Sequence, residues 1–121
     1  ERDQGTPGGF SAAGLERAGQ LDAAATAFRA IAGKWPLDAA ALIGLANVQY
    51  ALSDLAAAER SLRDATRRDP QSPAAWNNLA VVLGERGDRA AAIAAVRRAI
   101  EIDGGRTALY RETLAELEAG G

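Results

Sequence analysis

The chain has 121 residues, a formal net charge of −2 and neither cysteine nor histidine. This length fits one modest domain, residues 1–121. The missing residue types exclude Cys/His nucleophile pairs, zinc sites built on these residues, and histidine acid–base chemistry. The charge gives no electrostatic argument for nucleic acid or an anionic membrane, and no apolar run approaches the roughly 18 residues of a membrane span. We therefore expect a soluble domain without catalytic activity, cofactor or metal, and without membrane insertion.

The composition favours helices. Alanine is the commonest apolar residue, whereas aromatic and β-branched residues, which favour strands, are scarce. Lys34 is the only lysine, so arginine supplies almost all the positive charge. This Ala/Arg bias is a compositional hint of a bacterial source, and it leaves the cytoplasm and the periplasm both open. The chain begins at Glu1 without a methionine, which is consistent with a piece of a longer protein.

An internal repeat runs along the chain and predicts its elements. Asp69 and Asp103 stand 34 residues apart at equivalent positions, and the same offset relates Ala58 to Ala92. The copies span about 5–38, 39–72 and 73–106, and each is expected to be an antiparallel pair of helices.

The first copy matches the others only in its second half, through Ala24, Phe28 and Pro36. Its first half is rich in glycine between Gly8 and Gly14, and glycine costs about 1 kcal/mol in a helix interior. We therefore expect a short or frayed first helix and a regular second one. Trp35 is expected to cover the seam between the first two copies.

In the second copy, Leu42, Leu45 and Ala46 lie on one helical face. Ser53-Asp54 then supplies a helix stop followed by a carboxylate that can cap the next helix. Asp69-Pro70 ends the copy, because the residue before proline is disfavoured in a helix.

The third copy is the most regular. Apolar residues form a stripe along one face of its first predicted helix. Gly87-Asp88 can then end that helix and cap the next one, which carries a second apolar stripe. Small residues at equivalent places in both copies, such as Ala46 and Ala80, allow helix axes to approach closely. The two stripes consist of Trp76, Leu79, Ala80 and Leu83, and of Ala92, Val96, Ala99 and Ile100.

The last predicted element is a helix over about residues 107–118. Tyr110, Leu114 and Leu117 fall on one face, and charged residues fall elsewhere. This pattern is typical of a terminal helix that caps a repeat stack.

The third copy resembles the tetratricopeptide repeat family in Trp76-Asn77-Asn78-Leu79-Ala80 and in the later positions of the pattern. The second copy departs from it at Leu42 and Gln49, and the first at Ile31. The resemblance implies an all-α fold, a right-handed superhelical stack of about three helix–turn–helix repeats plus the C-terminal capping helix. The matching later positions are Leu83, Gly87-Asp88, Ala92, Val96 and Ala99.

The resemblance also implies a concave face that is lined by the first helices and holds an extended peptide. The asparagine amides are the strongest candidates, because an amide offers both a donor and an acceptor to a peptide backbone. The lysines that complete a terminal-carboxylate clamp in chaperone-binding members are absent, because Ile43 and Ala108 stand in their places and Glu112 replaces an arginine. The groove positions carried over are Asn47, Asn78, Tyr50, Asn77, Arg111, Ile43, Val81 and Glu85.

Simpler interpretations stay open at several positions. Asn77 and Asn78 could serve the scaffold rather than a ligand, and Tyr50 could pack on Trp76 instead of facing the groove. Charges four residues apart on the second helices, such as Glu59/Arg63, Asp64/Arg68 and Arg97/Glu101, are expected to form solvated pairs.

The sequence therefore predicts a non-catalytic scaffold whose partner is a protein or an extended peptide segment. The partner's identity and orientation, the oligomeric state and self-association stay open. An alternative is the accessory C-terminal segment of a bacterial papain-like cysteine peptidase whose catalytic domain is absent. That weaker resemblance rests on Trp35-Pro36, Gly44-Leu45-Ala46-Asn47, Asn77-Asn78-Leu79-Ala80 and Tyr110-Arg111-Glu112-Thr113-Leu114.

Overall fold

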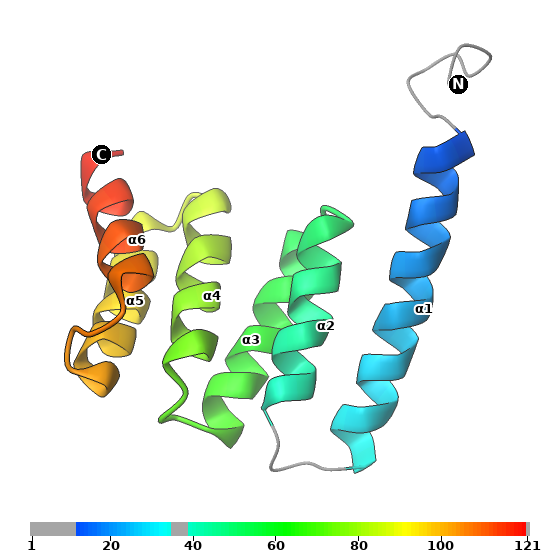
Figure 1. The fold of residues 1–121 in the computed structure, drawn as a ribbon. Coiled ribbons are helices and arrows are strands. Elements are labelled where there is room, and N and C mark those ends of the chain that lie inside the picture. The colour runs from blue at the N-terminus through cyan, green and yellow to red at the C-terminus, as the bar shows by residue number, and fades with distance from the viewer. Residues whose placement is uncertain (1–11, 35–38, 121) are drawn as a thin grey trace.

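The computed structural model describes residues 12–34 and 39–120, with only the backbone at residues 12–16. This part of the chain contains six α-helices and no strand, which confirms the all-α prediction. The helices are stacked in chain order, from α1 at one end to α5 and α6 at the other (Figure 1). They are α1 (Ala12–Lys34), α2 (Ala40–Ala51), α3 (Leu55–Arg68), α4 (Pro73–Glu85), α5 (Arg89–Asp103) and α6 (Ala108–Ala119).

The second and third copies form the helix pairs α2/α3 and α4/α5, with the predicted turns between their helices. Asp54 caps α3 and Asp88 caps α5, each accepting a hydrogen bond of 3.2 Å from the backbone amide three residues later. The residues before them, Ser53 and Gly87, adopt φ values of 65° and 91°. A left-handed residue followed by a capping carboxylate therefore reverses the chain in both copies.

The first copy differs from the prediction. Instead of a short helix, a turn and a second helix, α1 runs for 23 residues without a break through Gly19 and Gln20. These two residues are equivalent to Gly87 and Asp88, but glutamine replaces the capping aspartate. We attribute the missing turn to the missing cap, because a side-chain cap is worth about 1 kcal/mol. Trp35 lies outside the described residues, as does the chain before α1.

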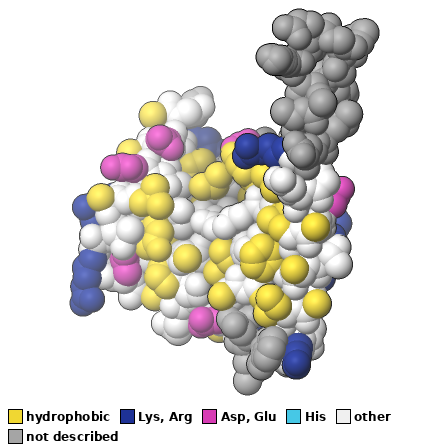
Figure 2. Space-filling view, turned by 45° about the vertical axis from the view of Figure 1, so that its right-hand side comes forward, with side chains coloured by type: hydrophobic (Ala, Val, Ile, Leu, Met, Phe, Trp, Pro, Cys, Tyr) yellow, Lys and Arg dark blue, Asp and Glu magenta, His cyan; other side chains and the backbone are white. Residues whose placement is uncertain are grey.

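The core consists mainly of alanines at helix crossings, with larger side chains between them. The predicted small positions are buried: Ala46 is 1% exposed, and Ala58, Ala80 and Ala92 are 0% exposed. Leu62 and Val96 are the largest fully buried side chains among the described residues. Figure 2 shows hydrophobic side chains gathered toward the middle of the face that it views, with charged ones mostly nearer its edge.

The order of contacts between helices gives the stack its two faces. The backbone of α4 lies close to those of α2 and α6. In the described part of the chain, the backbones of α3 and α5 do not come equally close to each other. The first helices therefore line the inner face, and α3 and α5 line the outer face. Tyr110, Leu114 and Leu117 of α6 pack against the core cluster to which α2, α3, α4 and α5 contribute, which confirms the predicted capping helix.

Candidate binding groove

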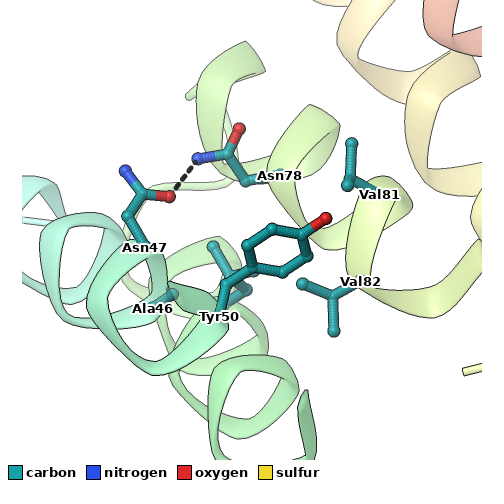
Figure 3. Close-up of a pocket in the computed structure, with 7 residues that line it drawn as sticks. Ala46, Asn47, Tyr50, Asn78, Val81 and Val82 are labelled. Carbon is teal, nitrogen blue, oxygen red and sulfur yellow. Dashed lines mark hydrogen bonds between the residues drawn. The ribbon is translucent and has the colours of Figure 1, made fainter. Parts of the chain in front are cut away.

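A hollow of about 150 Å³ opens between α2 and α4 on the inner face. Its floor is apolar, because Ala46, Leu62 and Val82 are core residues exposed by 3% or less. Tyr50 and Val81 form its sides, and the two asparagines stand at its edge (Figure 3). Four of the predicted groove residues thus meet around one hollow, here called the first hollow: Asn47, Tyr50, Asn78 and Val81.

The two asparagines are joined to each other. The amide nitrogen of Asn78 donates a hydrogen bond of 3.1 Å to the side-chain oxygen of Asn47 (Figure 3). Asn47 keeps its NH₂ donor and Asn78 keeps its oxygen acceptor, because neither atom bonds to another described residue. The bonded pair therefore offers one donor and one acceptor, the combination that a peptide unit needs.

Tyr50 and Glu85 form a second link between α2 and α4. The Tyr50 hydroxyl donates a hydrogen bond to a carboxylate oxygen of Glu85. This bond, together with desolvation and the negative charge of Glu85, raises the pKa of Tyr50 above its ordinary value. The tyrosine ring faces the first hollow (Figure 3). The hydroxyl thus bonds to Glu85, while the ring lines the hollow.

The remaining predicted groove residues lie elsewhere. Asn77 is only 3% exposed, so a ligand could not reach it, and its inclusion in the groove is wrong for this structure. Its side-chain oxygen has no hydrogen-bond partner among the described residues. Ile43 packs against two groups of buried residues, one with Ala46 and Leu79 and the other with Leu42 and Leu45. Arg111 is exposed, but its guanidinium donates to the carbonyl of Gly105 at the start of α6.

A second hollow of about 180 Å³ continues the inner face between α4 and α6. Val81 lines both hollows, so they are neighbours, and Glu85 stands at the second. Of the residues that α6 contributes, Leu117 is expected from the sequence in the apolar face of the terminal helix, whereas Thr113 and Glu116 are not among the predicted groove residues. The repeat offset could have found Glu116, since it follows Val82 of the first hollow by 34 residues. The second hollow is lined by Val81, Gly84, Glu85, Thr113, Glu116 and Leu117.

The outer face carries ion pairs, and two of the three pairs named from the sequence are among them. Glu59 binds Arg63 at 2.8 Å, and this contact is the main cause of the lowered pKa of Glu59. Asp64 binds Arg68 at 3.2 Å. The predicted partner of Arg97 is wrong, because its guanidinium lies 3.2 Å from Glu118 of α6.

Trp76 also belongs to this side of the stack. It is half-buried against the core, as predicted, and its indole nitrogen donates to the carbonyl of Pro70 at 2.9 Å. Its ring lines a hollow on the outer face rather than the first hollow.

The described residues hold no group of three acidic side chains suited to a metal ion. In the same part of the chain, no helix is both long and apolar enough to cross a membrane.

A family model described as the tetratricopeptide repeat matches residues 14–59 and 43–107. The chain belongs to the tetratricopeptide repeat (TPR) family. The match includes α1, although α1 is a single helix rather than a complete repeat. No curated protein sequence matches the chain significantly.

Solved TPR structures share this fold at low sequence identity. SycD of Yersinia enterocolitica in complex with a peptide of the translocator YopD is 18% identical, with a TM-score of 0.76 over 87% of this chain and 85% of SycD. The Sgt2 TPR domain of Aspergillus fumigatus is 21% identical, with a TM-score of 0.79 over 89% of this chain and 72% of that one. The TPR2B domain of yeast Sti1 in a complex with pHsp70 is 18% identical, with a TM-score of 0.77 over 85% and 86%. Neither the family model nor these structures support a connection with cysteine peptidases.

Proposed function

We propose that this TPR stack is a non-catalytic scaffold that binds an extended segment of a partner protein along its inner face. The binding groove consists of the first and second hollows, which share Val81. The observation that carries the proposal is the hydrogen-bonded pair of Asn47 and Asn78 above an apolar floor. The amides would bind the backbone of the segment, and the hollow would take one of its side chains.

Two similar structures support a peptide ligand by analogy. SycD was solved with a peptide of YopD, and the Sti1 domain in a complex with pHsp70. This chain differs from them in more than three quarters of its residues, so the analogy supports a peptide ligand but not the same peptide.

The test begins with peptides selected from a random displayed library on the purified chain. Their dissociation constants are then measured for the wild type and for Asn47→Ala/Asn78→Ala. Each backbone hydrogen bond is worth about 0.5–1.5 kcal/mol, so losing two should raise Kd roughly 5- to 150-fold. The melting temperature should hardly change, because replacing both amides together leaves neither without its partner.

Gln71→Ala is the matched control, because it also removes an exposed side-chain amide, in the turn before α4. It should leave Kd unchanged. Unchanged binding by the double variant would place the site outside the groove. A large loss of stability in that variant would instead make the asparagines part of the scaffold.

A further inference from the structure

Charge is distributed unevenly between the two faces of the stack. The inner helices carry four carboxylates against one arginine: α2 has no charged residue, α4 has only Glu85, and α6 carries all the others. The outer helices α3 and α5 carry seven arginines against four carboxylates. The groove therefore lies on the acidic side of the molecule.

The carboxylates that line the groove still have oxygens available to bind a ligand. Glu85 is exposed, and its bond from Tyr50 occupies one of its two carboxylate oxygens. Glu116 is exposed and makes no ion pair with another described residue. The one arginine of the inner helices, Arg111, donates to Gly105 and lines neither hollow. Among the described residues, no cationic side chain lines the second hollow, and the neighbouring Arg89 of α5 donates to the backbone carbonyls of Leu117 and Glu118 rather than to these carboxylates.

We infer that the groove selects a cationic internal segment, in which an aliphatic side chain enters the first hollow and a lysine or arginine lies between Glu85 and Glu116 at the second. This inference rests on the proposed function and specifies the chemistry of its partner. An acidic segment or a terminal carboxylate would place like charges together at the second hollow, which is unfavourable.

The size of the first hollow limits what it can hold. An apolar cavity of about 150 Å³ is large enough for a molecule such as benzene. The first hollow has this volume and an apolar floor. It therefore suits one leucine-sized or isoleucine-sized side chain, while the asparagine pair bonds to the backbone beside that residue.

The separation of the two hollows sets the spacing within the segment. They lie on opposite sides of α4, so their centres are about one helix spacing apart, roughly 8–10 Å. A segment in the extended polyproline II conformation advances about 3.1 Å per residue and turns every third side chain to the same side. The cationic residue should therefore follow or precede the aliphatic one by about three positions.

The experiment uses the peptides selected on the full wild-type chain, and it first compares their composition with that of the starting library. Lysine and arginine should be enriched about three positions from an aliphatic residue, and acidic residues should be depleted. A selected peptide is then measured against Glu85→Gln/Glu116→Gln. Two exposed ion pairs are lost, so Kd should rise roughly two- to thirty-fold.

Two controls isolate the charge contact. The same peptide with its lysine replaced by glutamine should bind the wild type and Glu85→Gln/Glu116→Gln equally. Asp64→Asn/Glu101→Gln removes the same charge from the outer helices and should leave Kd close to that of the wild type.

The outcomes separate the two proposals. Selected peptides that are acidic or neutral, yet need Asn47 and Asn78, would overturn the charge preference and leave the proposed function intact. Cationic peptides that bind both double variants as tightly as the wild type would place binding outside the groove and overturn the proposed function itself.

Discussion

Among single residues, Tyr50 has the most informative environment. Its hydroxyl donates to Glu85, so ionising the phenol would bring two negative charges together and leave the carboxylate without its donor. The pKa of Tyr50 is therefore raised above 10.0. The stabilisation from this bond is present below the ordinary pKa and is lost as the pH rises through the raised one.

Glu85→Gln should lower the pKa of Tyr50 toward its ordinary value, because the carboxylate's charge is removed. The chain has two tyrosines, so Tyr110→Phe leaves Tyr50 as the single phenol to follow by its phenolate absorbance. In this background the titration midpoint should lie at a lower pH with Glu85→Gln than without it. Equal midpoints would mean that the bond between α2 and α4 does not form in solution.

Residue positions in the groove could be predicted where one helix determines them. The repeat offset and helical spacing bring Asn47, Tyr50, Asn78 and Val81 to one hollow, as expected from the sequence. Asn77 could not be predicted in this way, because its burial depends on how neighbouring helices enclose α4. A polar residue type favours exposure, but packing between elements decides it.

At the scale of the helices, the turns were predictable wherever a carboxylate caps the following helix. Asp54 and Asp88 fulfil this role, and both turns form where expected. The 34-residue period predicts a helix pair in the first copy as well, but at Gly19-Gln20, the positions equivalent to Gly87-Asp88, the structure has a continuous helix. Periodicity indicates which residues are equivalent, whereas the local cap determines whether the chain turns.

The close contact between α1 and α2 depends on Gly44, because the ring of Phe28 lies where a side chain would be. A Cβ atom on Gly44 would lie 2.5 Å from Cε1 of the Phe28 ring, and two other ring atoms would also be too close. Gly44→Ala should therefore displace Phe28 and destabilise the fold by about 1–3 kcal/mol. The measurement is urea unfolding followed by circular dichroism.

Gly19→Ala is the matched control for this change. It makes the same substitution within α1, but a Cβ atom there would meet nothing within 4 Å. Alanine should stabilise the helix by up to about 1 kcal/mol. If Gly44→Ala stabilised the protein equally, Phe28 would not rest on α2 as the structure has it.

Across the whole molecule, stability should vary along the stack, because each unit of a repeat protein contacts only its neighbours. α4 packs against α2, α3, α5 and α6, and it buries Ala75, Leu79, Ala80, Val82 and Leu83. The described hydrophobic side chains of α1 include only two buried ones, Ala25 and Ala32. The chain should therefore open first at α1.

Hydrogen exchange followed by mass spectrometry can check this gradient. Amides of α4 and α5 should exchange most slowly, and those of α1 fastest, because local opening is easiest where little apolar surface is buried. The pattern should not depend on protein concentration. Slow exchange of α1 that appears only at high concentration would show that a second copy covers it.

The separation of carboxylates and arginines also affects how a partner arrives. With acidic inner helices and basic outer ones, the stack has an electric dipole across its thickness. Beyond direct contact, such a field acts over about 10 Å at 0.1 M salt. It exerts a torque on an approaching charged chain and favours encounters in one orientation. The distribution of charge would thus guide a cationic segment toward the groove before any hydrogen bond forms.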